Sequence, residues 1–263
     1  MKANDISPLF AEERREQILR ILKENSKLQV AELCAHFEVS PATIRNDLRD
    51  LEAANKLKRT HGGAVPVGKA GFELNSLQKN ISNQEEKMRI AAKAASLIED
   101  GDTIALDTGT TTLELAKQIT DRQDLSVVTN DLVIASFLEV NSSANIILVG
   151  GILRKGFHCT VGPAALSQLA EYNVDKVFMA ANAVSLEKGF TTPGLDLAEV
   201  KKKMMSIASQ VIFLLDSSKF GRITFIRFAE LGDADRIVTD EGVGKATVAQ
   251  IRAAYDNLEV IIV

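Results

Sequence analysis

The 263-residue sequence has no long hydrophobic run, and this absence limits where the protein can act. No apolar stretch approaches the roughly 20 residues that a membrane-spanning helix needs. The N-terminal stretch at positions 1–16 also lacks the apolar core of a signal peptide. We therefore expect neither a membrane span nor export, and we expect the protein to act in the cytoplasm.

Cysteine and histidine are also scarce. The two cysteines, Cys34 and Cys159, lie far apart without the spacing of metal ligands, and the three histidines are dispersed. A lone cysteine in a reducing compartment is usually a small core residue. No G-x-G-x-x-G follows a strand pattern, and the P-loop-like stretch at positions 242–245 lacks the first glycine and the magnesium-binding hydroxyl of that motif. We expect no metal and no cofactor.

Positions 30–49, which read VAELCAHFEVSPATIRNDLR, have the pattern of a helix-turn-helix. A short helix carries Leu33 and Phe37 on one face, and a turn follows at positions 38–39. Ser40 then suits the N-cap of a second helix, and Pro41 suits its first position, where the missing N–H costs nothing. The alternative is an ordinary helical hairpin.

The second helix of this pattern has an apolar side and a polar side. At about 100° per residue, positions i, i+4 and i+7 form an apolar stripe of Ile44, Leu48 and Leu51. The opposite side carries small, amide and guanidinium side chains: Ala42, Arg45, Asn46 and Arg49. Such a helix fits a major groove of DNA, where arginine pairs with guanine and asparagine with adenine.

A basic segment after the second helix predicts a β-wing. Positions 57–63 read LKRTHGG, and the two glycines allow a tight turn and a close approach to a phosphate. We predict that hydroxyls at the helix start hold phosphates, that the helix reads bases and that the wing adds contacts. The predicted DNA-binding residues are Ser40, Thr43, Arg45, Asn46, Arg49, Arg59, His61 and Gly62. For His61, an exposed neutral side chain without a contact is an equally open alternative.

The net charge of −4 is distributed unevenly along the chain. Positions 1–65 hold 11 Lys and Arg against 10 Asp and Glu, whereas the remainder holds 20 basic and 25 acidic residues. A nearly neutral N-terminal part with its arginines on one face is typical of a site-specific DNA reader. A non-specific binder would carry a large basic excess.

The sequence pattern changes twice along the chain. A helix at about positions 12–25 supplies Ile18, Ile21 and Leu22 to the core of an N-terminal domain at 1–64, and positions 65–84 have the composition of a linker. From 85 to 263, helices alternate with short apolar strands such as TIALD, LSVVTN and VIFLLD. Continuous apolar strands separated by helices predict a mostly parallel sheet covered on both faces. The fold class is therefore α/β, with an N-terminal winged helix-turn-helix.

The strand TIALD runs into a threonine-rich helix start, DTGTTT, at positions 107–112. Ligands of α/β sheets bind at the carboxyl ends of strands, and a helix N-terminus offers free N–H groups to an anion. The predicted effector-binding residues are Asp107, Thr108, Gly109, Thr110, Thr111, Thr112, Asn130, Gly151, Lys202 and Lys219. The open alternatives are a merely structural helix cap and, for the lysines at 201–203, a solvated face from which one could turn inward.

Together these segments resemble the DeoR family of bacterial regulators of sugar metabolism, over nearly the whole chain. The N-terminal marks are SPATIRNDLRDLE at positions 40–52 and RTHGGA at 59–64, and the C-terminal marks are LDTGTTT, VTN, VGG, GFTTP and DSSKFGR. The resemblance implies a C-terminal sensor domain related in fold to ribose-5-phosphate isomerase. The chain departs from the family at Ala180 and Asn182, where Gly and Asp are frequent, and at Asn46, where a second arginine is common.

The resemblance implies a DNA-binding repressor of a carbohydrate-utilisation operon, whose operator binding responds to a phosphorylated sugar or polyol. Because one recognition helix reads only a few base pairs, we also expect a homo-oligomer built from two-fold dimers. The competing hypothesis is a phosphosugar isomerase. An isomerase needs a general base near the substrate carbon. Positions 181–183 offer no carboxylate, although Asp107 could serve.

Overall fold

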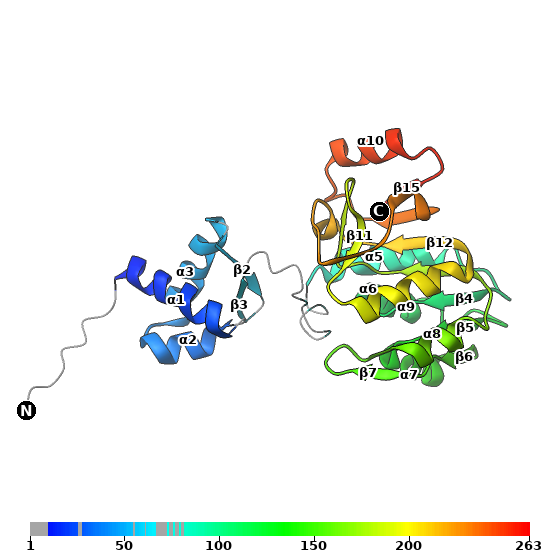
Figure 1. Ribbon diagram of the computed structural model, residues 1–263, viewed down its shortest axis with the longest axis horizontal. Coiled ribbons are helices and arrows are strands. Elements are labelled where there is room, and N and C mark those ends of the chain that lie inside the picture. The colour runs from blue at the N-terminus through cyan, green and yellow to red at the C-terminus, as the bar shows by residue number, and fades with distance from the viewer. Residues whose placement is uncertain are drawn as a thin grey trace, which may run out of the picture. The chain divides into compact units, whose positions relative to one another are not determined.

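The structure, a computed structural model, describes residues 10–25, 28–54, 56–60, 62–66, 73, 76, 79 and 82–263 (Figure 1). The chain divides into two compact units, Met1–Lys69 and Ala70–Val263. The division lies within the segment predicted as a linker, and the predicted domain boundaries at positions 64 and 84 stay predictions. Within the part of the chain that the structure describes, no helix combines the length and the apolar character needed to span a membrane.

The N-terminal unit is a winged helix-turn-helix, as predicted. Its elements are α1 (Ala11–Asn25), β1 (Leu28–Gln29), α2 (Val30–Phe37), α3 (Pro41–Ala53), β2 (Leu57–Thr60) and β3 (Gly63–Pro66). The predicted stripe of α3, formed by Ile44, Leu48 and Leu51, is buried. It belongs to one hydrophobic core with Ile18 of α1 and Leu33 of α2.

A short strand, β1, joins the two wing strands, and Gly63 makes this possible. The strands pair in the order β1-β3-β2. A Cβ atom on Gly63 would lie 1.6 Å from the carbonyl oxygen of Leu28, so only glycine fits beside that backbone. A Cβ on Gly62 would meet nothing within 4 Å. Gly63 is therefore required for strand pairing, and Gly62 is the glycine that lies open at the turn.

A buried ion pair joins α1 to α3. The Nε atom of Arg14 lies 2.5 Å from Oδ2 of Asp47, and the two side chains are only 9% and 3% exposed. Arg15 lies 3.1 Å from the other oxygen of Asp47 and also pairs with Asp50. Since removing one partner of a buried pair leaves an uncompensated charge, this network fixes α3 to its scaffold.

The C-terminal unit is built on a seven-stranded sheet in which every pairing is parallel. The strands lie in the order β15-β14-β12-β9-β4-β5-β6. Their bounds are β4 (Thr103–Leu106), β5 (Ser126–Thr129), β6 (Asn145–Leu148), β9 (Val174–Met179), β12 (Ala208–Leu214), β14 (Arg236–Thr239) and β15 (Glu259–Ile262). The prediction of a mostly parallel α/β sheet is confirmed.

Helices cover both faces of this sheet (Figure 1). Neighbouring strand residues pack into different cores: Ala105 belongs to one, whereas Ile104 and Leu106 belong to the other. The first core includes residues of α8 (Pro163–Leu169), α9 (Leu195–Ser206) and α10 (Lys245–Ala254). The second includes residues of α5 (Gln84–Ala95), α6 (Thr110–Lys117) and α7 (Leu132–Asn141). Burial on both faces explains why the strands read as continuous apolar runs.

The C-terminal unit also contains an antiparallel hairpin, a second small sheet and two short turns, which the predicted alternation of helices and apolar strands did not include. The hairpin consists of β7 (Ile152–Arg154) and β8 (Cys159–Val161), and the second sheet of β10 (Ala183–Ser185), β11 (Gly189–Thr192) and β13 (Ile226–Ala229). Two 3-10 turns are η1 (Ser217–Lys219) and η2 (Leu231–Asp233). Strands of three or four residues are too short for a period-two pattern to stand out in a sequence.

Candidate functional site

The first candidate site is the exposed face of α3, which begins at a capped N-terminus. The Oγ atom of Ser40 accepts the backbone N–H of Thr43 at 3.2 Å and lies 2.9 Å from the Thr43 hydroxyl. The predicted N-cap, with Pro41 in the first helical position, is therefore confirmed. That these two hydroxyls also hold DNA phosphates stays a prediction.

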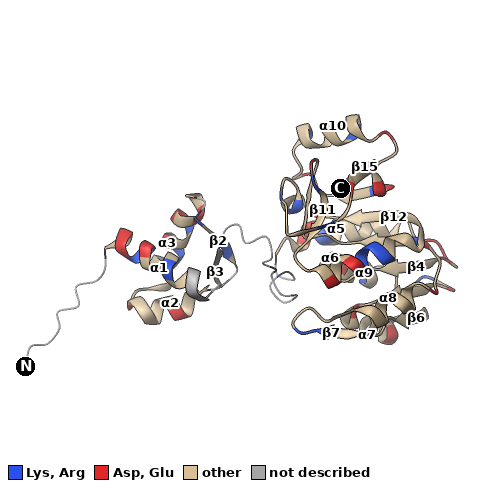
Figure 2. Cartoon of the chain, viewed as in Figure 1, with Lys and Arg blue, Asp and Glu red and all other residues tan. Residues whose placement is uncertain are grey.

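Three polar side chains of α3 project into solvent from the side opposite its buried stripe. Arg45, Asn46 and Arg49 are all exposed, as the helical spacing predicts. The Arg49 guanidinium donates a hydrogen bond to the side-chain oxygen of Asn46. Figure 2 shows basic residues of this unit on α1, α3 and β2. The helix therefore presents an amide and two guanidinium groups, the donors and acceptor suited to base edges in a major groove.

The wing contributes an arginine that is already paired. The Nε atom of Arg59 lies 2.7 Å from Oε2 of Glu52, and the Arg59 backbone N–H donates to Oε1 at 2.9 Å. Burial raises the pKa of Glu52, but the hydrogen bonds and charge of Arg59 outweigh it and lower this pKa. The pair links β2 to α3. His61, the other predicted side-chain contact of the wing, lies outside the described residues.

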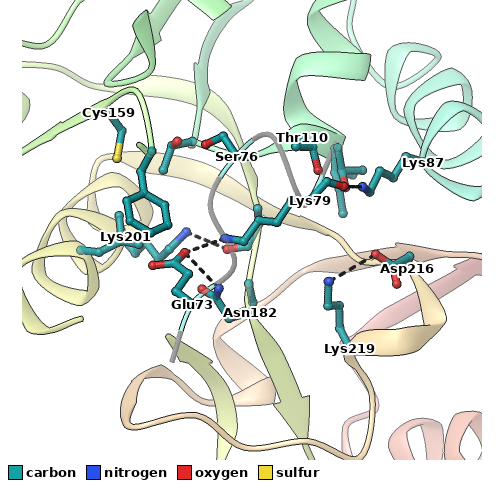
Figure 3. Close-up of a pocket in the computed structure, with 18 of the residues that line it drawn as sticks. Glu73, Ser76, Lys79, Lys87, Thr110, Cys159, Asn182, Lys201, Asp216 and Lys219 are labelled. Atoms are coloured by element: carbon teal, nitrogen blue, oxygen red, sulfur yellow. Dashed lines mark hydrogen bonds and ion pairs between the residues drawn. The ribbon is translucent and has the colours of Figure 1, made fainter. Parts of the chain in front are cut away.

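The second candidate site is a pocket of the C-terminal unit, with a volume of about 660 Å³ including its open mouth. Residues directly after β4, β9 and β12 line it, as expected for an α/β sheet. Its polar lining residues are Glu73, Ser76, Lys79, Lys87, Thr108, Thr110, Thr111, Arg154, Cys159, Asn182, Lys201, Asp216 and Lys219 (Figure 3).

The start of α6 forms one wall of this pocket. Gly109, Thr110 and Thr111 line it, and the first N–H groups of a helix have no partner within the helix. The Thr108 hydroxyl donates to Asp131 at 2.6 Å, which fixes the loop before the helix. A Cβ on Gly109 would come within 3.0 Å of a neighbouring side chain. This wall can receive an anion through backbone N–H groups.

Cations outnumber carboxylates on the pocket wall. The cationic lining residues are Lys79, Lys87, Arg154, Lys201 and Lys219, and the acidic ones are Glu73 and Asp216. Lys219 Nζ lies 3.6 Å from Oδ2 of Asp216. An excess of positive charge in a partly closed pocket attracts an anionic ligand.

Lys87, on α5, is a pocket cation with a displaced pKa. Its Nζ donates to the carbonyl oxygen of Lys79, and the residue is 3% exposed. Burial lowers the pKa of Lys87 to about 8, an effect that Lys219 and Lys79 increase and Asp216 opposes. The positive charge that Lys87 adds to the pocket therefore changes just above neutral pH.

Lys201 is buried on α9 and turns inward from the lysine run that Figure 2 shows in blue. Its Nζ pairs with Asp107 and donates to the Ala180 carbonyl oxygen at 2.9 Å. Asp107 is fully buried, and its Oδ1 has no hydrogen-bond partner. Asp107 is not among the residues that line the pocket, but it pairs with Lys201, which does line it.

Four other predicted effector residues also lie away from the pocket. Thr112 donates its hydroxyl within the first turn of α6, at 2.9 Å, and Lys202 is exposed on the outer side of α9. Asn130 is fully buried and donates to a backbone carbonyl of β8 at 2.9 Å. A Cβ on Gly151 would lie 2.6 Å from another β8 carbonyl oxygen. Local packing of the helix turn and the hairpin accounts for Thr112, Asn130 and Gly151, whereas Lys202 is exposed to solvent. The pocket includes none of the four.

Two pocket lysines that the sequence reasoning missed carry a detectable signal. Lys201 follows Leu197 by four residues and precedes Met204 by three, so it lies on the buried side of α9. Lys87 precedes the buried Ile90 and Ala91 of α5 by three and four residues. A lysine within an apolar helical stripe must find a polar partner inside the protein, and this marks it as a candidate site residue.

Family models match both units of the chain. The DeoR-like helix-turn-helix domain matches residues 14–69, and the DeoR C terminal sensor domain matches residues 82–241. The second match alone covers more than half of the sequence. The predicted family resemblance is therefore confirmed.

Characterised and uncharacterised regulators match over most of the chain. It is 38% identical to the HTH-type transcriptional regulator GlpR of Haloferax volcanii, over 87% of this chain and 89% of the relative. It is 34% identical to the transcriptional repressor AccR of Agrobacterium fabrum, over 88% and 90%. Among solved structures it is similar to ribose 5-phosphate isomerase A from Methanocaldococcus jannaschii, with a TM-score of 0.40, 21% identity and coverage of 53% and 55%.

Proposed function

Because the chain belongs to the DeoR family of transcriptional regulators, we propose that it represses a carbohydrate-utilisation operon and that a phosphorylated sugar or polyol controls its operator binding. Its N-terminal unit is the DNA-binding domain and its C-terminal unit the sensor domain of that family. The name of the repressor relative supports repression. The relatives are regulators rather than enzymes, so the isomerase hypothesis is not favoured.

The observation that carries the effector proposal is a helix N-terminus and a surplus of cations in one pocket. Backbone N–H groups at Thr110 and Thr111 supply directional donors, and Lys219 supplies charge. A phosphate uses both, because charge-assisted hydrogen bonds are shorter and stronger than neutral ones. The Asn182 amide lines the same pocket and can donate to a ligand oxygen.

Control of operator binding requires that the effector distinguishes two states of the protein. A ligand shifts an equilibrium only by the difference between its affinities for the two states. Couplings of about 1–3 kcal/mol are typical of allosteric proteins. We expect the sugar phosphate to bind the state with weaker operator affinity, which would release the operon from repression.

The proposed functional form is a homo-oligomer built from two-fold dimers, since one recognition helix reads too few base pairs for genomic specificity. Exposed apolar side chains of the C-terminal unit, such as Ile152 and Phe225, each 67% exposed, favour an interface there. Light scattering at micromolar protein concentration should give at least the dimer mass. A monomer that retains tight operator binding would contradict this.

Calorimetry with matched pairs of ligands tests the effector proposal. Glucose 6-phosphate, fructose 6-phosphate and ribose 5-phosphate are each compared with the corresponding free sugar. At least one phosphorylated form should bind more tightly than its free sugar, and Lys219→Ala should weaken that binding by about tenfold or more. Lys202→Ala is the matched control, because Lys202 is exposed and lies outside the pocket. Equal affinity for phosphorylated and free sugars, or parent-like binding by Lys219→Ala, would overturn the proposal.

A further inference from the structure

The pocket contains a second cationic cluster, apart from the threonine wall, and a carboxylate of the protein itself occupies it. The cations Arg154 and Lys79, together with the neutral amide of Asn182, form this cluster, which we name the Arg154 subsite. We propose that Glu73 is an internal occupant of this subsite, and that a second acidic group on the effector displaces it. This inference rests on the proposed function, and it specifies the effector as a sugar phosphate that carries another anionic group.

The contacts of Glu73 are those of a bound ligand. Its carboxylate lies 2.6 Å from Lys79 Nζ and 3.0 Å from Arg154 Nη2, and it accepts a hydrogen bond from Asn182 Nδ2 at 3.1 Å (Figure 3). The side chain is 6% exposed. Burial opposes ionisation of Glu73, but the neighbouring cations and Asn182 outweigh it and lower its pKa. The subsite therefore already stabilises a negative oxygen pair in a nearly dry environment.

Two of the three donors of the subsite, Arg154 and Asn182, are positioned by elements other than the segment of Glu73. The Arg154 guanidinium lies 4.2 Å from the centroid of the Phe157 ring, a stacking contact that keeps it oriented. Arg154 belongs to the hairpin strand β7, and Asn182 lies directly before β10. When Glu73 leaves, these two donors stay in place for another anion.

The ligand group that takes the place of the Glu73 carboxylate must be anionic. Among the described residues, Glu73 is the only carboxylate paired with Arg154 or Lys79. Its departure would leave both cations unpaired, and a neutral sugar hydroxyl cannot compensate two partly buried charges. A carboxylate or a second phosphate can. Both groups fit the same chemistry, and the pocket is continuous from this subsite to Thr110.

Glu73 also belongs to the segment that leads to the DNA-binding unit. The chain divides between Lys69 and Ala70, so Glu73 lies four residues into the sensor unit. Ser76 of the same segment donates its backbone N–H to Gly156 at 3.1 Å, and Lys87 binds the Lys79 carbonyl oxygen. An effector that displaces Glu73 therefore acts on the chain that connects sensing to DNA binding.

Equilibrium dialysis of the full-length protein against radiolabelled inorganic phosphate tests the subsite by counting bound ions. The parent should bind one phosphate per chain, at the threonine wall, because Glu73 fills the other position. The isosteric variant Glu73→Gln should bind two. Adding Arg154→Met to Glu73→Gln should return the count to one. Glu259→Gln, which also removes a carboxylate from an arginine but lies outside the pocket, should behave like the parent.

A Glu73→Gln protein that binds no additional phosphate, with thermal unfolding that shows it folded, would overturn the inference. Glu73→Ala serves as a second variant with the same expected count. The outcome separates this inference from the proposed function. If the parent binds one phosphate that Lys219→Ala loses, and Glu73→Gln gains none, only the subsite is wrong. If the parent binds none, but Glu73→Gln gains one that requires Arg154, only the threonine wall is wrong.

Discussion

The charged side chains of α3 and those at the pocket are exposed to very different degrees. In the N-terminal unit, Arg45 and Arg49 stand in solvent on the free face of α3. In the C-terminal unit, Lys201 and Asp107 are 2% and 0% exposed. A DNA duplex is large and brings its own phosphates to an exposed surface, whereas a small anion must be surrounded by donors that have already lost their water. Substitutions in α3 and in the pocket should therefore have separable consequences.

The largest expected effect is loss of stability when the buried pair of the sensor unit is broken. Lys201→Met leaves Asp107 fully buried without its counter-ion, and such a change costs about 3–5 kcal/mol. Urea denaturation should show this loss. Lys202→Met, one position along the same helix, should change stability by less than about 0.5 kcal/mol because the side chain is exposed. Equal stability of the two variants would show that the buried Lys201–Asp107 pair does not stabilise the C-terminal unit.

In α3 we expect a substitution to change DNA affinity but not the free energy of unfolding. Arg45→Ala should weaken binding to an operator selected from random DNA by about 1–3 kcal/mol, if the guanidinium contacts a base. The free energy of unfolding should stay within about 0.5 kcal/mol of the parent. Arg20→Ala, an exposed arginine of α1, is the matched control. Unchanged operator affinity for both Arg45→Ala and Arg49→Ala would show that this face does not read DNA.

A smaller effect is expected at the helix cap. Ser40→Ala removes the acceptor of the Thr43 N–H and should destabilise the N-terminal unit by about 1 kcal/mol. Ser40→Gly should cost only a few tenths of a kcal/mol, because glycine is tolerated at an N-cap. Thermal unfolding of the two variants measures this difference. If both variants weaken operator binding equally without this difference in stability, the hydroxyl acts on phosphate rather than as a cap.

The smallest expected effect is a pH dependence of effector binding. Lys87 is charged below its pKa of about 8 and loses that charge as the pH rises through this value. Affinity for a sugar phosphate, whose own second pKa is about 6, should therefore fall less than tenfold between pH 7 and 9. Lys87→Met should remove most of this slope. A slope unchanged in Lys87→Met would contradict the assignment.

The recognition helix could be predicted almost completely from sequence. Its cap, its first proline and its buried stripe are all set by neighbours within eleven positions, so helical spacing was enough to place Arg45 and Arg49 on the open side. The parallel sheet followed for a similar reason, since buried strands are recognisable by composition. What escaped were short strands such as β7 and β10, which carry too few residues for a pattern.

The pocket was only partly predictable because its residues come from distant parts of the chain. The strand-end rule correctly brought Thr110 and Lys219 to one pocket. It could not select Glu73 or Arg154, because nothing local to those residues indicates the ion pair between them, 81 positions apart. Lys202 was predicted to bind the effector, but Lys201 is the lysine that lines the pocket. Successive side chains of a helix are rotated by about 100°, so neighbouring positions can differ between solvent and core.

An operator-release titration measures whether an anion in the pocket of the C-terminal unit controls operator binding. Fluorescence anisotropy follows labelled operator as the tightest-binding sugar phosphate from calorimetry is added. The parent and Lys202→Ala should release DNA at the same ligand concentration. Lys219→Ala should bind operator with the affinity of the parent. It should need at least about tenfold more ligand to release the operator. Release of operator from Lys219→Ala at the parent's concentration would contradict the account.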